Sequence, residues 1–114
     1  MSKKLGNFTV NVNDSIRTAM LKISANKYRV VVVLDGEKVV GTVSDGDIRR
    51  AFLKEVLAMA PVETIMNINC RMTTETDPIK QRKVIVREKV TVLPVVNANG
   101  ELLDVVLAYE PFNE

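Results

Sequence analysis

The sequence lacks histidine and tryptophan, and its one cysteine is Cys70. Without histidine, the chain cannot build a Ser-His-Asp triad or an imidazole general base, and most catalytic zinc sites are also excluded. One cysteine cannot form an intrachain disulfide, which is typical of a reducing compartment. We therefore expect a cytoplasmic protein in which Cys70 is a small apolar residue.

Aromatic residues make up only 4% of the sequence, and the net charge of +2 comes from acidic and basic residues that are interspersed. A single-stranded nucleic-acid site needs aromatic side chains for stacking and a basic groove for phosphates, so we expect no nucleic-acid partner. Residues 1–4 precede no apolar segment typical of a signal peptide, and no apolar run is long enough to cross a bilayer. We expect no membrane partner.

The sequence does contain a repeat at an offset of 63 residues. Residues 13–16 are matched by 76–79, and residues 30–41 by 93–104. Two copies of such a period suggest paired units that bury their apolar faces against each other, and the 46% hydrophobic content can form that core. We predict a mixed α/β (α+β) fold of two β-α-β-β-α units packed as a pseudo-twofold pair, the second lacking its last helix.

Hydrophobic periodicity and turn residues give the expected elements. The first unit is predicted to contain strands at 8–12, 28–34 and 38–43, a helix from the N-cap Asp14 to about Asn26, and a helix from Gly46 that includes Val56. The second is predicted to contain strands at 71–73, 92–96 and 102–107, and a helix at 79–89 after Asp77 and Pro78. Residues 64–67 are expected to form a helical turn. The predicted boundaries are 6–57 for unit 1, 58–70 for the linker and 71–110 for unit 2.

Residues 41–50 read Gly-Thr-Val-Ser-Asp-Gly-Asp-Ile-Arg-Arg and lie between a predicted strand and a predicted helix. Free N–H groups and the helix dipole at such a junction attract an anion. The carboxylate of Asp47 can accept hydrogen bonds from ribose hydroxyls beside it. This run favours binding a nucleotide over breaking one. Ser44 and Asp47 also fit a variant capping box, and the two roles can coexist.

Arg49 and Arg50 follow in the first turn of the same helix, where a positive charge opposes the helix dipole. Either an anion lies nearby, or these arginines form salt bridges with Asp45, with Asp47 or with another subunit. The two aspartates have no companion base, nucleophile or metal ligands, which argues against a small enzyme and against a metal site.

Three segments together resemble a pair of CBS domains, also called a Bateman module. They are residues 31–50, the Ile-Met-Asn run at 65–67, and the Leu-Pro-Val-Val-Asn run at 93–97. The resemblance covers about residues 6–110. It implies a regulatory module, not an enzyme, which binds AMP, ADP or ATP between its units and forms homodimers through helices near 48–56 and 79–90.

The resemblance also implies roles for particular residues. It assigns Ser44 to the phosphate and Asp47 to the ribose. The remaining ligand-binding residues that we expect are the backbone of Arg29, Val30 and Val31 against the base, the apolar walls Val10 and Val12, and Arg50. The second unit has Asp104, Leu107 and Glu110 where the first has Gly41, Ser44 and Asp47, so we expect at most one nucleotide site.

The Asp-Gly-Asp-Ile-Arg-Arg variant is similar to CBS pairs in sugar-nucleotide metabolism. One type precedes sugar nucleotidyltransferases and another follows sugar-phosphate isomerases. The start and end of this chain fit the first type better, so we expect a sensor module with a nucleotidyltransferase domain in cis. The alternatives are the CBS pair of a sugar-phosphate isomerase, or a CBS dimerisation and interaction module that has lost its ligand.

Overall fold

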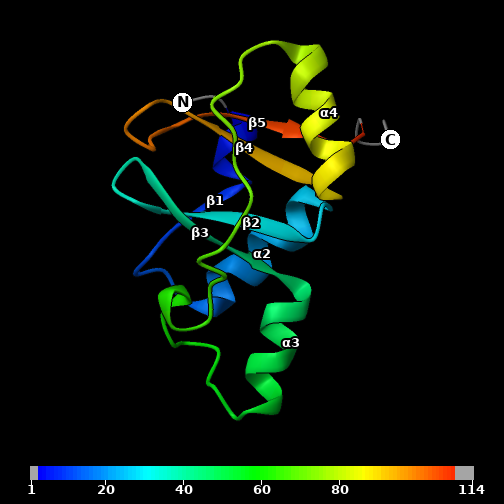
Figure 1. The fold of residues 1–114 in the computed structure, drawn as a ribbon. Coiled ribbons are helices and arrows are strands. Elements are labelled where there is room, and N and C mark those ends of the chain that lie inside the picture. Colours follow the sequence, from blue (N-terminus) through cyan, green and yellow to red (C-terminus); the bar gives the residue numbers. More distant parts are fainter. Residues whose placement is uncertain (1–2, 110–114) are drawn as a thin grey trace.

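The computed structural model describes residues 3–109 (Figure 1). Among these residues, no helix is both long and apolar enough to span a membrane. The elements in chain order are α1 (Lys3–Gly6), β1 (Thr9–Asn11), α2 (Ile16–Asn26), β2 (Val30–Asp35), β3 (Lys38–Ser44), α3 (Asp45–Leu53), the 3₁₀ helix η1 (Val62–Thr64), α4 (Pro78–Glu88), β4 (Val92–Val96) and β5 (Leu102–Leu107). The mixed α+β class is confirmed. The predicted absence of a last helix concerns residues that extend beyond the described part of the chain.

The strands form two sheets of related topology. In the first sheet, β1 runs parallel to β2, and β2 is antiparallel to β3. In the second, β4 is antiparallel to β5, and an isolated parallel bridge joins Thr73 to Val95 as β1 joins β2. Gly36 and Gly100 have φ values of +64° and +82° in the two hairpin turns, a region that glycine enters without a steric penalty.

β2 is buried on both of its faces. Val31 and Val33 are fully buried against a cluster that contains Ile16 and Ile48 from the helices of the first unit. Val32 points the other way, because side chains alternate across a strand, and packs with Val105 of the second unit. Figure 1 shows the resulting layers, with β4 and β5 on one side of the first sheet and α2 and α3 on the other.

The helix ends follow local side-chain chemistry. Asp77 accepts a hydrogen bond from the Ile79 N–H, and Pro78 is the first residue of α4, as predicted. The predicted cap of α2 was wrong by one residue. The Ser15 hydroxyl caps this helix by accepting from the Thr18 N–H, because the carboxylate of Asp14 instead accepts from the Asn11 N–H.

Three other predictions differ from the structure. The strand predicted at 71–73 is reduced to the Thr73 bridge. The helical turn predicted at 64–67 lies earlier, at Val62–Thr64. Val56 lies outside α3, which ends at Leu53 because Glu55 adopts a left-handed φ of 67° and the Val56 N–H turns back to the Ala51 carbonyl.

The segment after η1 crosses the end of β3. Thr42 and Asn67 exchange two backbone hydrogen bonds, of 3.1 and 2.8 Å between nitrogen and oxygen. This crossing requires a residue without a side chain at Gly41, because a Cβ there would lie 2.9 Å from the Asn67 carbonyl oxygen and 3.0 Å from the sulfur of Met66. Gly41 therefore lets the linker lie beside the residues that connect β3 to α3.

We expect Gly41→Ala to lower the free energy of unfolding by about 1–3 kcal/mol, the usual cost of overpacking a close contact. Urea denaturation followed by circular dichroism measures the change. Gly6→Ala is the matched control, because nothing lies within 4 Å of a Cβ at Gly6. Equal unfolding midpoints for the two variants would show that the linker does not pack on β3 in solution.

Candidate functional site

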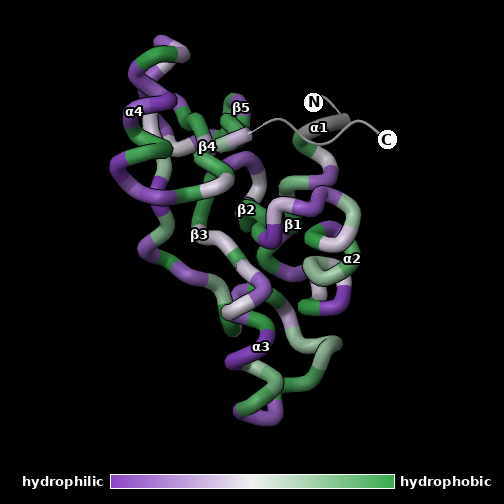
Figure 2. Tube along the Cα trace, turned by 90° about the vertical axis from the view of Figure 1, so that its right-hand side faces the viewer, coloured by the Kyte–Doolittle hydropathy of each residue, from purple (hydrophilic) through white to green (hydrophobic). Residues whose placement is uncertain are grey.

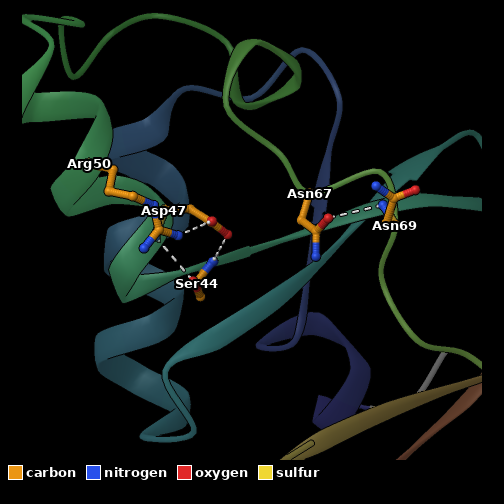
Figure 3. Close-up of polar contacts among 5 residues, drawn as sticks. All are labelled: Ser44, Asp47, Arg50, Asn67 and Asn69. Atoms are coloured by element: carbon orange, nitrogen blue, oxygen red, sulfur yellow. Dashed lines mark hydrogen bonds and ion pairs between the residues drawn. The ribbon is translucent and has the colours of Figure 1, made fainter. Parts of the chain in front are cut away.

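Ser44 and Asp47 hold each other at the junction of β3 and α3. Ser44 is the N-cap of α3, and its hydroxyl accepts a hydrogen bond from the Asp47 N–H at 3.1 Å. Asp47 Oδ2 accepts from the Ser44 N–H at 2.9 Å (Figure 3). The capping box is therefore confirmed. It fixes both side chains at the point where β3 ends and α3 begins. Two N–H groups of the first turn already have partners, because the Asp45 N–H donates to the Arg29 carbonyl and the Asp47 N–H to Ser44.

Arg50 engages the other oxygen of the same carboxylate. Its Nη2 donates to Asp47 Oδ1 at 2.7 Å, and Figure 3 shows the guanidinium lying beside the helix start. The Asp47 side chain is 17% exposed and the Arg50 side chain 66% exposed. Of the salt bridges considered for Arg50, the pair with Asp47 is therefore present. Both Asp47 oxygens have partners within the chain.

Two hollows lie on either side of the Met66–Asn67 crossing. The first, the α3 hollow, has a volume of about 280 Å³, and its lining includes Asp47, Arg50 and Met66. The second, the inter-unit hollow, has a volume of about 370 Å³, and its lining includes Asn67. Because Met66 and Asn67 are consecutive, the two hollows adjoin.

The inter-unit hollow draws its lining from both halves of the chain. Val30 and Thr42 come from the first unit and residues 69–70 from the linker, while residue 71 and residues 89–92 come from the second unit. Asn67 lies between the Ser44–Asp47–Arg50 group and Asn69 in Figure 3, and its side-chain oxygen accepts from the Asn69 N–H at 3.0 Å. A ligand here would contact two parts of the fold that meet only through tertiary packing.

Of the other predicted site residues, Val30 lines the inter-unit hollow, and the rest line neither hollow. The Arg29 carbonyl is nevertheless close to the group, since it accepts from the Asp45 N–H at 3.1 Å. Val10 and Val31 are 2% and 0% exposed in the core of the first unit, and Val12 packs against the same core. Arg29, with a φ of 69°, lines a separate surface hollow with Lys27 and Asp45. The structure thus brings together Ser44, Asp47 and Arg50 and sets Val30 in the adjoining hollow. The contacts predicted for the other positions stay predictions.

Sequence reasoning missed the contribution of the second unit to the inter-unit hollow. The missed lining residues include Asn69, Arg71, Lys89 and Thr91. The repeat contains a signal for one of these segments, because the offset of 63 residues relates Thr91 and Val92 to Tyr28 and Arg29. The expected backbone contacts at 29–31, moved by the same offset, fall at 92–94, and Val92 does line the hollow.

The pseudo-twofold relation also places a hollow on the opposite side of the pair. This opposite hollow has a volume of about 520 Å³ and is lined by Phe8 and Tyr28 of the first unit and by Leu107 of the second. It is the larger of the two, but Leu107 provides no hydroxyl where the first unit has Ser44. The Tyr109 ring stacks on Tyr28 at 4.8 Å between ring centroids. Glu110, the predicted counterpart of Asp47, lies outside the described residues.

Two titratable groups near the inter-unit hollow have shifted pKa values. Partial burial raises the pKa of the Cys70 thiol, so the thiol is protonated at neutral pH. The hydrogen bond from Arg87 lowers the pKa of Glu88, and the nearby Arg71 guanidinium, 2.6 Å away, acts in the same direction. Arg71 is thereby tied to α4. Within residues 3–109, no three side chains of His, Cys, Asp or Glu gather as a metal site would require.

Comparison with curated proteins relates the chain to parts of larger enzymes. It is 30% identical over 95 residues to arabinose 5-phosphate isomerase GutQ of Escherichia coli K12, covering 82% of this chain and 30% of the isomerase. It is 28% identical over 109 residues to an inosine-5'-monophosphate dehydrogenase of Korarchaeum cryptofilum, covering 91% of this chain and 21% of that protein. The chain therefore spans less than a third of the length of either relative.

Solved structures show the same architecture. A CBS domain protein from Pyrobaculum aerophilum, solved as a complex with AMP, is similar with a TM-score of 0.69 and 25% identity, over 87% of this chain and 78% of that one. A Methanocaldococcus jannaschii protein, described as a putative archaeal γ-AMPK homologue, is similar with a TM-score of 0.71 and 24% identity, over 87% of this chain and 42% of that one.

The family model named CBS domain matches residues 1–54, which include β1 to β3, α2 and the Ser44–Asp47 junction. The paired sheets and their helices agree with the solved CBS structures. Residues 1–54 of this chain thus match the CBS domain model, and the overall fold is that of solved CBS-domain structures.

Proposed function

We propose that this chain is a regulatory CBS pair that binds an adenine nucleotide between its units, at residues 6–57 and 71–110, with 58–70 as the linker. The observation that carries this proposal is the fixed Ser44–Asp47 pair, whose carboxylate lines the α3 hollow together with Met66. The next linker residue, Asn67, lines the hollow that both units form. Support also comes from the AMP complex of the Pyrobaculum aerophilum protein, which has the same fold.

The chemistry of the two adjoining hollows suits the parts of a nucleotide. Val30, Val90 and Val92 offer apolar contacts for a base in the inter-unit hollow. Asp47, on the other side of Asn67, offers a carboxylate for ribose hydroxyls, since charge-assisted hydrogen bonds are the stronger kind. Ser44 uses its oxygen to accept from the Asp47 N–H and keeps its hydroxyl hydrogen to donate to a phosphate oxygen.

The proposed role is regulation of a domain in cis, not catalysis. A ligand between the units shifts an attached domain only if it binds two arrangements of the pair with different affinity. Among the relatives described above, the GutQ isomerase favours the sugar-phosphate isomerase alternative. Neither relative is a nucleotidyltransferase, so the nucleotidyltransferase association stays a prediction from the Asp-Gly-Asp-Ile-Arg-Arg run at 45–50 and from the start and end of the chain.

A second candidate role is interaction with another copy of the chain. Phe52 and Leu53 at the end of α3, with Leu57 and Met59 after it, are 41%, 78%, 76% and 72% exposed. Figure 2 shows this apolar stretch at the end of the molecule farthest from α4. We propose that α3 and this stretch form the homodimer contact, since large exposed apolar patches mark interaction sites.

We expect Asp47→Asn to weaken AMP binding by about 1.5–3 kcal/mol, because it removes a charged acceptor while keeping the side-chain shape. Isothermal titration calorimetry measures the affinity. Asp45→Asn is the matched control, because it changes a neighbouring carboxylate on the same helical turn that does not line the α3 hollow. Unchanged AMP affinity in a folded Asp47→Asn protein would remove the ribose role.

A thermal-unfolding series with AMP, ADP and ATP separates the regulatory site from a ligand-free interaction module. Ligand at a hundred times its dissociation constant adds about 2.7 kcal/mol to the free energy of unfolding. We expect this stabilisation for at least one of the three nucleotides. A melting temperature that none of them changes favours the interaction module.

Sedimentation equilibrium tests the dimer contact. We expect Leu53→Asp to increase the fraction of monomer, because it places a charge in the proposed apolar contact. Leu103→Asp is the control on β5, where the side chain is 54% exposed and lies outside the proposed surface. A wild-type monomer at high micromolar concentration would argue against homodimerisation.

A further inference from the structure

Both oxygens of Asp47, the carboxylate proposed for the ribose, accept a hydrogen bond from within the chain. Asp47 Oδ2 is directed at the Ser44 N–H, a bond that also holds the start of α3. Asp47 Oδ1 accepts a hydrogen bond from Arg50 Nη2 at 2.7 Å. Each carboxylate oxygen can accept a second hydrogen bond. A ribose hydroxyl that approaches Oδ1 nevertheless meets the Arg50 guanidinium and competes with it, whereas displacing the Ser44 N–H would uncap the helix.

Gly46 provides the space in which the guanidinium lies. A Cβ at Gly46 would come within 3.2 Å of Arg50 Nη1 and 3.5 Å of Arg50 Nη2. The guanidinium thus covers the first turn of α3 as well as the outer oxygen of Asp47. The φ of Gly46 is not in the left-handed region, so a side chain at this position would meet the guanidinium and not a backbone restriction.

The ion pair is weak enough for a ligand to displace. Arg50 is 66% exposed, and exposed ion pairs change an equilibrium by about fivefold at most. Arg50 shares the α3 hollow with Lys54, and Asp47 is the one carboxylate that lines it among the described residues. Once displaced from Asp47, the guanidinium gains most from a new anion, and a ligand phosphate supplies one.

We propose that Arg50 makes this site select phosphorylated ligands over neutral nucleosides. This inference rests on the proposed binding of adenine nucleotides. A nucleoside that takes the place of Arg50 on Asp47 Oδ1 leaves the guanidinium without an anionic partner. A nucleotide breaks the same pair but gives Arg50 its phosphate, so the arginine changes from a competitor of the ribose to a ligand of the phosphate.

The test compares adenosine and AMP by calorimetry on the wild type and on Arg50→Met. We expect adenosine to bind about two- to fivefold more tightly to Arg50→Met, because the competitor is gone. AMP should bind about tenfold more weakly, because a charge-assisted hydrogen bond is lost. Arg49→Met is the matched control, a neighbouring exposed arginine that does not line the α3 hollow, and it should keep the wild-type ratio of affinities.

Gly46→Ala provides a second variant that keeps the arginine. Its Cβ would lie 3.2 Å from Arg50 Nη1, so the guanidinium must shift by a few tenths of an ångström. We therefore expect the ratio of adenosine to AMP affinity to change in the same direction as in Arg50→Met, but by less. Opposite changes for adenosine and AMP in Arg50→Met support selection by Arg50. Equal changes for both ligands, or an unchanged ratio, overturn it and leave the nucleotide site standing. A folded wild type that binds neither ligand overturns the proposed function and this inference together.

Discussion

The burial of β2 on both of its faces organises the whole molecule. Val31 and Val33 are covered by the helices of the first unit, while Val32 is covered by the sheet of the second. Neither unit can bury this strand alone, so the hydrophobic effect that folds the first unit also holds the second against it. The inter-unit hollow and the opposite hollow follow from this packing. The edges of two twisted sheets diverge on both sides of the central strands, and this divergence leaves the space.

At the candidate site, the same hydrogen bonds serve the helix and the proposed chemistry. Ser44 and Asp47 cap α3, and by doing so they hold a hydroxyl and a carboxylate at the edge of the inter-unit packing. A residue that caps a helix has a fixed rotamer, so little conformational entropy remains to be lost when a ligand binds. Arg50 is the mobile member of this group, since two thirds of its side chain is exposed.

Local patterns predicted what depends on local chemistry. The valine run, the Asp35-Gly36 turn, the Asp77-Pro78 helix start and the Ser44–Asp47 box were all readable from neighbouring residues. The strand at 71–73 was overpredicted because strand pairing depends on a partner that the sequence does not display. The N-cap of α2 is Ser15 and not the predicted Asp14, because the Asp14 carboxylate accepts a hydrogen bond from the backbone N–H of Asn11, three residues upstream.

The parts of the site that escaped prediction depend on distant residues. Thr42, Asn67 and Thr91 line one hollow although long stretches of chain separate them. The linker crossing at Gly41 brings Asn67 to Thr42, and the packing of the two units brings Thr91 near them, where its hydroxyl donates to the Tyr28 carbonyl. The orientation of Arg50 likewise depends on the space at Gly46 and not on the charge pattern alone. For Arg50 the sequence left open a nearby anion or a salt bridge, and tertiary packing places it against Asp47.

The aromatic contact between the units has an optical consequence. The sequence has no tryptophan and two tyrosines, and these two rings stack on each other across the boundary between the first and second halves of the chain. The Tyr28 hydroxyl also donates to the Tyr109 carbonyl. Near-ultraviolet absorption and tyrosine emission therefore report on how closely the two halves are docked. The separation of the halves can thus be followed by spectroscopy without an added dye.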